Sequence, residues 1–425
     1  MMSKNALKMS RRDFMKAAAL GGSAAAMARF LPLVAAQEIT GSVTYWHHFT
    51  SETEFQGMER VIALFRERYP NINLIQENIP NAEFMAKFTQ AVQANSRPDT
   101  TMIASDRLPD MVAMNGVLDL TDRVNNWELR EFFPANRWEG ITRDGKIYGV
   151  PAFTFVDWMY YRLDWFEEAG LSVPTTLAEF REAAIALTDA SQGRFGFGMR
   201  GGGGGQGFII DMLESFGSPI LDADGNPAID RDLAIEALAF WTGLYTTDGV
   251  VPRSAPEDSY RQMMEGFKTG QTAMIWHHSG SLREVSDVLE PGVQFTTAVK
   301  PAGPAAHITR VSYLYNGLMS DINADAAWAW VSFWGEAEPA IAFLEETGYF
   351  PVSEAIANDE RITGNPIYQA ALEAAGIGRL PQSFIGYPAW STQVVLPAFQ
   401  KVLVGDYSVE EAVDEMIFGL EDAVR

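Results

Sequence analysis

Short β-branched segments alternate in this chain with longer segments whose apolar residues recur at helical spacing. The first part gives strands at residues 39–46, 72–76 and 100–104, with helices around 58–65 and over 84–94 between them. This alternation predicts a mainly parallel sheet covered by helices. We therefore expect an α/β fold, and its 425 residues are too many for a single core, so two domains are expected.

The later part of the chain continues the alternation. Helices are predicted over residues 177–190, 233–245 and 326–334, and a strand is predicted over 312–320. Between them, residues 297–304 are rich in Pro, Ala and Gly. This change of character predicts a passage of the chain from one domain to the other.

The N-terminus predicts export. Residues 10–16 read Ser-Arg-Arg-Asp-Phe-Met-Lys, a twin-arginine signature, and a weakly apolar stretch of small residues follows. That stretch is rich in glycine, is interrupted by Arg29, and is shorter than the about 20 apolar residues that span a bilayer. Val34-Ala35-Ala36 supplies a cleavage pattern, so residues 1–36 are the expected signal peptide and Gln37 the expected first residue of a periplasmic protein.

Composition excludes several classes of function. The chain has no cysteine, which removes disulfides, thiolate metal sites and iron–sulfur clusters, and we expect no cofactor. The net charge is −23, and loss of residues 1–36, with six basic residues and one acidic residue, would make it −28. Such a charge disfavours nucleic acid and anionic membranes as partners. It also disfavours a highly anionic ligand, unless a local basic pocket outweighs the overall field.

Residues 148–170 read Tyr-Gly-Val-Pro-Ala-Phe-Thr-Phe-Val-Asp-Trp-Met-Tyr-Tyr-Arg-Leu-Asp-Trp-Phe-Glu-Glu-Ala-Gly. A strand at 158–161 is entered through a proline bend, and the helix after it should end at Gly170. Residues 270–274 form a Gly-x-x-Ala-Met pattern and residues 347–351 read Thr-Gly-Tyr-Phe-Pro. With these motifs the chain resembles extracellular solute-binding family 1, the periplasmic sugar-binding proteins that feed ABC importers.

The resemblance implies a two-lobed periplasmic binding protein fold of type II, joined by a hinge of several crossings. It implies an N-terminal lobe of residues 37–150 plus 302–350 and a C-terminal lobe of residues 151–301 plus 351–425. It also implies a monomer that binds a mono- or oligosaccharide between the lobes and delivers it to an ABC permease. Ligands of open α/β sheets bind at the carboxyl ends of strands, so the site is expected in the loops there.

Trp46, His47 and His48 follow the first predicted strand. An aromatic ring can stack on a sugar face while a histidine binds a hydroxyl, although packing at the strand end is an equally good alternative. A zinc site is disfavoured, because zinc needs three or four convergent ligands and neighbours in an extended segment point to opposite sides.

Asp106 and Arg107 follow the third predicted strand. They resemble the pair that maltose-type binding proteins use on sugar hydroxyls, because a carboxylate accepts hydroxyl protons and a guanidinium donates a fork. The alternatives are a surface ion pair and a helix cap. Around the strand at 158–161, the resemblance implies that Asp157 faces the sugar, with Phe155 and Trp158 beside it.

The remaining candidates come from the second half of the chain. Gln206 closes a run of five glycines, predicted to be a flexible cleft loop because the ending of a phosphate-binding loop is missing. His278, Ser279 and Gly280 precede a helix predicted over 282–289, whose backbone N–H groups could face a hydroxyl or an anion. The set is completed by Tyr313 and Trp390.

Three functions remain open. A sugar receptor is favoured, and a glycerol-3-phosphate or polyol receptor is the alternative, because Ser279-Gly280-Ser281 resembles glycerol-3-phosphate-binding relatives. An enzyme is less favoured, because the sequence contains neither a nucleophile elbow nor a His-Glu-x-x-His helix. Asp106 and Asp157 could still form the pair of carboxylates, about 5–10 Å apart, that a glycosidase needs.

Overall fold

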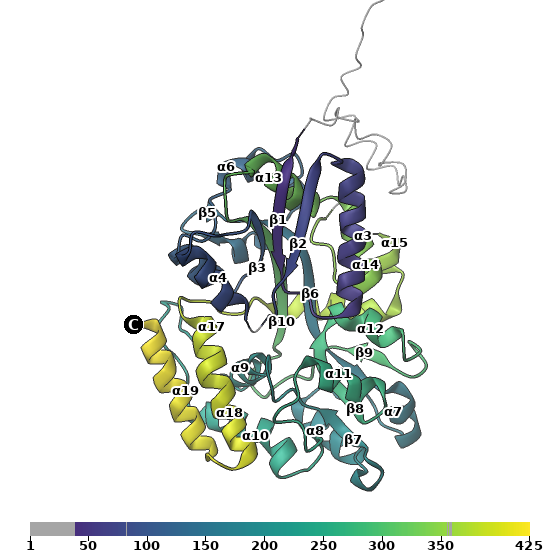
Figure 1. The fold of residues 1–425 in the computed structure, drawn as a ribbon. Helices are drawn as coiled ribbons and strands as arrows, with labels where there is room; N and C mark the ends of the chain where they lie inside the picture. The colour runs from purple at the N-terminus through teal and green to yellow at the C-terminus, as the bar shows by residue number, and fades with distance from the viewer. Residues whose placement is uncertain (1–38, 82, 355, 357–358) are drawn as a thin grey trace, which may run out of the picture.

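The computed structural model describes residues 39–81, 83–354, 356 and 359–425. The predicted signal peptide at residues 1–36, and the predicted start at Gln37, lie outside these ranges. Within them, no helix is both long and apolar enough to cross a membrane. The chain forms two lobes, one above the other in Figure 1, and two long strands, β6 and β10, run between them.

The first lobe is built on three parallel strands at the start of the chain. β1 pairs with β2 on one side and with β3 on the other. A capping box at Ser51 starts α3, and Met58, Ile62 and Phe65 turn its buried face to the sheet. The elements are β1 (Gly41–His47), β2 (Ile72–Asn78), β3 (Thr100–Ala104), α3 (Glu52–Arg68), α4 (Phe84–Gln93), α5 (Leu108–Ala113), α6 (Thr121–Asn125), α13 (Ala324–Phe333) and α14 (Ala337–Thr347).

The second lobe is built on β8 and β7, which are parallel to each other. Gly170 ends its first helix with a left-handed φ of 65°, as predicted. The elements are β7 (Phe195–Gly198), β8 (Thr272–His278), β9 (Thr296–Ala298), α7 (Leu163–Ala169), α8 (Leu177–Ala186), α9 (Gln206–Ser215), α10 (Arg231–Thr246), α11 (Tyr260–Lys268), α12 (Leu282–Ser286), α17 (Tyr387–Trp390), α18 (Leu396–Val404) and α19 (Val409–Val424).

The two lobes share β6 (Val150–Tyr161). Its first half pairs with β10 (Thr309–Leu318), and its second half, from Asp157 onward, pairs with β8. The prediction of a strand limited to 158–161 was therefore wrong. The strand continues through Pro151, because the β10 register shifts beside it, between Leu314 and Tyr315.

The strand order is β2-β1-β3-β10-β6-β8-β7, with β9 beside β6 and the short β11 (Gly378–Arg379) beside β10. β10 runs antiparallel to both β3 and β6, and β6 runs antiparallel to β8. The α/β prediction is confirmed. The expected mainly parallel sheets are interrupted at the centre, because strands that cross between the lobes in opposite directions pair there.

The protein has two large apolar cores, and the first extends past the crossing to Met264, Phe267 and Phe295. In the first, Trp330 packs edge-on against Tyr45 with ring centroids 5.2 Å apart. In the second, Trp241 and Trp276 lie 5.1 Å apart. The segment after residue 350 contributes to both cores: Val352 and several residues from Ile362 to Ala374 pack in the first, and several residues from Tyr387 to Leu420 pack in the second. The predicted lobe boundaries stay a prediction.

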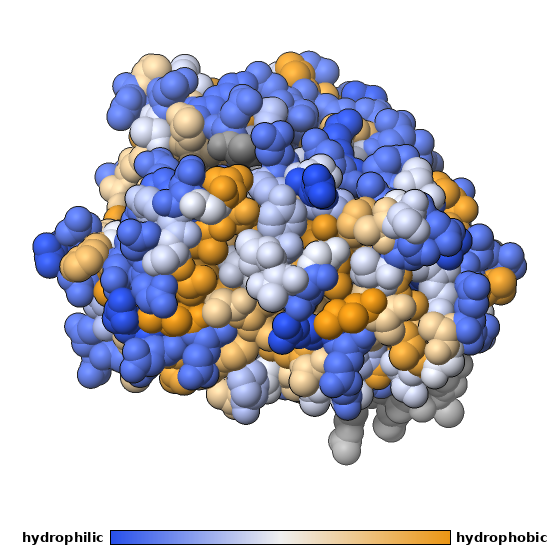
Figure 2. Space-filling view, turned by 90° about the horizontal axis from the view of Figure 1, so that it is seen from below, coloured by the Kyte–Doolittle hydropathy of each residue, from blue (hydrophilic) through white to orange (hydrophobic). Residues whose placement is uncertain are grey.

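The face of the molecule seen from below is mixed in character. Apolar side chains gather across its middle, and charged and polar side chains lie mainly around its edge (Figure 2). The helix α16 (Gln369–Ile377) packs against the crossing strands β6 and β10. The crossing strands thus meet the strand ends of both lobes at the middle of β6.

Candidate ligand-binding site

The middle of β6 lies where the strand ends of the second lobe meet the crossing. β7 and β8 are parallel, so their carboxyl ends lie at the same edge of the sheet. His278 ends β8 and is the register partner of Asp157 on β6. This edge is where open α/β sheets bind ligands.

A buried network of charges surrounds Asp157. Arg310, at the start of β10, forms an ion pair through Nη2 with Asp157 Oδ2 at 3.0 Å, and donates from Nη2 to Asp211 Oδ2 at 3.3 Å. Lys300 donates from Nζ to the same oxygen of Asp211 at 2.7 Å, and only 2% of the Lys300 side chain is exposed. Burial raises the pKa of the Asp211 carboxyl, but Arg310 and Lys300 outweigh burial and lower this pKa below its ordinary value. Asp211 is therefore a stable anion that holds both cations in place.

The Asp157 carboxyl behaves differently. Burial raises its pKa, and the attraction of Arg310 and Lys300 only partly opposes burial. Its backbone carbonyl accepts a hydrogen bond of 2.5 Å from the hydroxyl of Thr309. The start of β10 thus holds both the side chain of Asp157, through Arg310, and its backbone carbonyl, through Thr309.

Gly207 on α9 makes room for Arg310. A Cβ atom added at this position would lie 2.4 Å from Arg310 Nη1, which is closer than Cβ contacts come. Arg310 and Asp211 line a pocket that also includes Glu214, Arg379, Gln382 and Tyr387. Burial, followed by the charge of Asp211, raises the pKa of Glu214 to about 7.

Aromatic rings form the other wall of this region. The His278 ring lies 4.8 Å from Phe155 and 5.5 Å from Tyr349, and 4.0 Å from His277. Burial, followed by the charges of Arg200 and Arg310, lowers the pKa of His278 to about 3. The imidazole is therefore neutral and keeps one donor and one acceptor. Its Nδ1 has no hydrogen-bond partner among the described residues.

The glycine run after β7 packs closely around the side chain of Arg200. Arg200 Nε donates to the carbonyl of Gly203 at 2.7 Å. A Cβ atom at Gly204 would lie 2.1 Å from Arg200 Nη2, and one at Gly201 would lie 2.2 Å from the Ala255 carbonyl. Flexibility was the predicted reason for these glycines, and the structure gives a different one. A residue without a side chain is needed here because a guanidinium and two stretches of backbone approach closely.

The first lobe contributes residues that are held mainly by their own neighbours. Trp46 Nε1 donates to Glu77, and only 5% of Trp46 is exposed. His47 Nε2 lies 3.1 Å from Gln76 Oε1, and burial lowers the pKa of His47 to about 4. The His48 ring packs 5.4 Å from Phe84. These contacts match the alternative of packing at the strand end, and no group of three possible metal ligands occurs in the described ranges.

Asp106 and Arg107 point in different directions. Arg107 Nη2 donates to the side chain of Asn81, and the guanidinium lies 5.1 Å above the Phe84 ring. Asp106 is half-buried and lies near Tyr387 of the second lobe. Burial raises the pKa of Tyr387, and the charge of Asp106 raises it further. Asp106 is therefore the member of this pair whose charge acts on Tyr387 of the second lobe.

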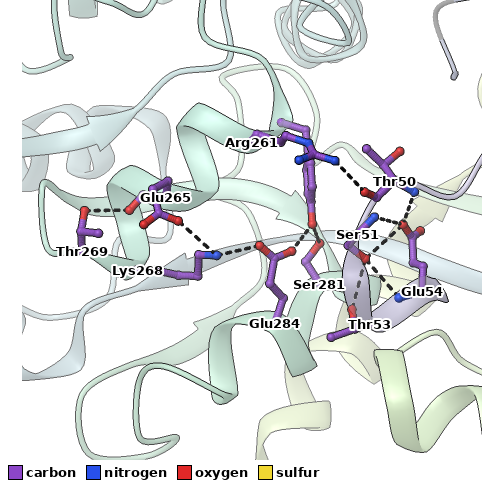
Figure 3. A network of polar contacts seen from close by, with 11 residues as sticks. Thr50, Ser51, Thr53, Glu54, Arg261, Glu265, Lys268, Thr269, Ser281 and Glu284 are labelled. Carbon is purple, nitrogen blue, oxygen red and sulfur yellow. Dashed lines mark hydrogen bonds and ion pairs between the residues drawn. The ribbon is translucent and has the colours of Figure 1, made fainter. Parts of the chain in front are cut away.

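Hydrogen bonds connect the lobes at two places outside the crossing strands. Asp110 Oδ1 accepts from the backbone N–H of Gly386 at 3.0 Å. Arg261, on α11 of the second lobe, donates to the carbonyl of Thr50 at 3.2 Å, as Figure 3 shows. The adjoining Glu54 accepts from the Thr50 N–H at 2.7 Å and from the Tyr349 hydroxyl at 2.7 Å. The structure is thus a form in which the lobes touch.

This architecture matches known proteins along most of the chain. The family model described as bacterial extracellular solute-binding protein matches residues 50–341. The chain belongs to this family. It is 25% identical over 304 residues, 70% of this chain and 72% of the other, to a protein of Brucella abortus described as a binding protein. It is 24% identical over 255 residues to the mannitol-binding protein of Pseudomonas aeruginosa, with 58% of this chain and 56% of that protein covered.

The fold is also shared with solved structures of solute-binding proteins. The maltose-bound structure of MalE3 from Thermotoga maritima superimposes with a TM-score of 0.83 at 21% identity, over 90% of this chain and 99% of that chain. The predicted two-lobed fold of periplasmic binding proteins is therefore confirmed. At this identity the similarity establishes the fold, and the ligand must be argued from the residues of the cleft.

In this solute-binding protein, the structure brings together Phe155, Asp157 and His278 from the predicted set. It places Trp158 and Trp390 elsewhere. Trp158 has no exposed surface and packs edge-on against Tyr160. Trp390 is 2% exposed and donates from Nε1 to the Met416 carbonyl at 3.0 Å. Their expected ligand contact is corrected to core packing, because a short helix, α17, turns Trp390 toward α19.

The segment from Ser279 to Ser281 also differs from expectation. α12 ends at Ser286 instead of reaching residue 289, and it is preceded by a single 3-10 turn. Ser279 and Gly280 are buried, and a Cβ atom at Gly280 would lie 2.4 Å from the Tyr349 ring. Tyr349 thus covers the backbone that was expected to bind a hydroxyl or an anion.

Two other predicted residues are held by partners within the protein. Tyr313 is 6% exposed, and its hydroxyl accepts from Arg137. Gln206 is half-buried, and its Oε1 accepts from the Gly204 N–H at 3.0 Å. Gln206 therefore stabilises the glycine loop that packs around Arg200.

The sequence interpretation missed Arg310, Asp211, Lys300 and Tyr387. Arg310 lies before the predicted strand at 312–320, which in the structure starts at Thr309. Asp211 is the single charge in the apolar run Gly-Phe-Ile-Ile-Asp-Met-Leu, and an isolated charge in such a run is a signal for a buried ion pair. Lys300 carries no comparable signal, because its partner is 89 residues away.

Proposed function

We propose that this protein is the periplasmic receptor of an ABC importer that binds a sugar or a polyol between its lobes and delivers it to the permease. One observation carries the proposal: a carboxylate, a guanidinium, an imidazole and an aromatic ring meet at one sheet edge. Asp157, Arg310, His278 and Phe155 supply them. Carboxylates and guanidiniums bind hydroxyls, and an aromatic ring covers the apolar face of a sugar.

The contacts between the lobes support a receptor that closes on its ligand. A ligand held by residues of both lobes has more contacts in the closed form and shifts the population toward it. Tyr387 of the second lobe lines the pocket, and the charge of Asp106 of the first lobe acts on it. The hydrogen bonds at Gly386 and Thr50 then add to the stability of the closed form.

A polyol is supported as a second candidate by the mannitol-binding relative. A linear polyol presents the same hydroxyls as a sugar without a ring face. The glycerol-3-phosphate alternative no longer depends on Ser279–Ser281, because Tyr349 covers that segment.

The proposal includes export by the twin-arginine route, a monomeric state and the absence of catalysis. The Arg11-Arg12 pair and the cleavage pattern before Gln37 support export. The Arg310 ion pair holds Asp157 in a binding role, and hydrolysis of a disaccharide on incubation would contradict this part of the proposal. Substitution of both arginines by lysine should leave the protein in the cytoplasmic fraction.

A thermal-shift screen tests the main proposal. A ligand that binds only the folded protein raises the melting temperature by mass action. The panel contains neutral monosaccharides and disaccharides, sugar acids, polyols and glycerol-3-phosphate. We expect at least one polyhydroxylated compound to raise the melting temperature, and silence across the whole panel would contradict the proposal.

A further inference from the structure

Arg200 stands out among the charges at the cleft edge. Asp157 and Asp211 face three cations there, Lys300, Arg310 and Arg200, and the two carboxylates pair with Arg310 and Lys300. Arg200 forms no ion pair with any carboxylate of the described residues, and its one hydrogen bond goes to a backbone carbonyl. Arg200 is therefore a cation beside this cluster that has no carboxylate partner among the described residues.

This charge is costly where it lies. Burial, followed by the repulsion of Arg310, lowers the pKa of Arg200 to about 10. Arg200 is half-buried, and a partly buried charge without a partner is unfavourable in a protein. The chain has 55 acidic residues, yet none of those in the described ranges forms an ion pair with Arg200. The hydrogen bond to the Gly203 carbonyl and the close packing against Gly204 nevertheless hold this guanidinium in one place.

The position of Arg200 points to the ligand. Arg200 follows the carboxyl end of β7, beside the end of β8 with its neutral His277 and His278. The charges of Arg200 and Asp157 act on each other without direct pairing. Arg200 thus lies at the same sheet edge as the groups proposed to bind hydroxyls.

We infer that the ligand carries one anionic group on its polyhydroxylated skeleton, and that Arg200 binds this group. The inference rests on the proposed function and names the substrate class more narrowly: a sugar acid, or a sugar or polyol phosphate. A guanidinium binds a carboxylate or a phosphate through two parallel hydrogen bonds. Asp157 and His278 then bind hydroxyls of the same molecule. A single local charge suffices in a chain that is acidic overall.

Isothermal titration calorimetry with matched ligand pairs tests the inference on the purified full chain. The pairs are galacturonate with galactose, gluconate with glucitol, and glucose 6-phosphate with glucose. In at least one pair we expect the anionic member to bind about tenfold more tightly or better, as for a charged hydrogen-bond partner. The preference should fall at high salt, and the pair that shows it distinguishes a carboxylate from a phosphate.

Two variants connect the preference to Arg200. Arg200→Gln should remove it, and Arg200→Lys, which keeps the charge but not the fork, should keep it at lower affinity. Arg194→Gln is the matched control, because Arg194 is exposed in the same lobe and stacks on Trp165. It removes the same unit charge and should leave the preference unchanged.

Several results would overturn the inference. If the neutral members of all pairs bind as tightly as the anionic members, the inference is wrong and the proposed function stands. If Arg200→Gln keeps the full preference for the anionic member, the inference is also wrong. If Arg200→Gln fails to fold by circular dichroism, the wild-type pairs and Arg200→Lys decide. Absence of binding to every compound would contradict the proposed function itself, and with it this inference.

Discussion

Replacing Gly207 by alanine tests whether the position of Arg310 controls the pocket. The new Cβ would lie 2.4 Å from Arg310 Nη1, so the guanidinium must move by roughly 1 Å to reach an ordinary contact. Arg310 then loses optimal geometry to Asp157 and Asp211, and a charged hydrogen bond is worth about 1.5–3 kcal/mol. Alanine returns up to about 1 kcal/mol of helix propensity in α9. We expect the free energy of unfolding to fall by about 1–2 kcal/mol and ligand affinity to fall at least about tenfold.

Gly243→Ala is the matched control. Gly243 lies within α10, and a Cβ atom there would meet nothing within 4 Å. This variant should raise the free energy of unfolding by about 0.5–1 kcal/mol and leave binding unchanged. Urea unfolding followed by tryptophan fluorescence, together with calorimetric titration of the ligand found by the screen, measures both quantities. If Gly207→Ala is stabilised like Gly243→Ala and binds normally, the role assigned to Arg310 is refuted.

Three further predictions concern the same region. Asp157→Ala should weaken ligand binding by about 1.5–3 kcal/mol in calorimetry, and an unchanged affinity would remove Asp157 from the site. Because the pKa of Glu214 is raised to about 7 in the folded protein, its contribution to stability is present at low pH and is lost as pH rises from about 4.5 to 7. Urea unfolding across this range should show that loss, of about 1–3 kcal/mol, in the wild type but not in Glu214→Gln; parallel curves would argue against it. Arg261→Ala, which removes the bond to the Thr50 carbonyl, should speed ligand dissociation about two- to fivefold in stopped flow while the unfolding free energy stays the same.

Much of the fold could be predicted because local signals agreed with the tertiary structure. The strand at residues 100–104 matches β3 at both ends, and Gly170 ends α7 as expected. The continuity of β6 through Pro151 could not be predicted, since it depends on a register shift in β10, far away in the sequence. A proline signals a bend until the partner strand is known.

The candidate site was only partly predictable for a related reason. Asp157 and His278 follow from motifs, because Asp157 directly precedes the predicted strand at 158–161 and His278 directly follows the Gly-x-x-Ala-Met strand segment. Asp211, Lys300 and Arg310 come from three separate segments, and single-residue patterns do not encode which cation meets which carboxylate. Trp390 shows the opposite error: an aromatic residue in a loop-like segment resembled a ligand contact, but a short helix turns it into the core.

The late return of β10 to the first sheet has a consequence for synthesis. Tyr45 on β1 donates its buried hydroxyl to Asn316 Oδ1 at 2.8 Å, across 271 residues of chain. Domains usually fold in order as they leave the ribosome. Here the N-terminal lobe lacks its central strand until most of the chain has been made. The lobe that is translated first therefore cannot complete its sheet before residue 318 has been made, and the nascent chain exposes the unpaired edge of β3 for most of its elongation.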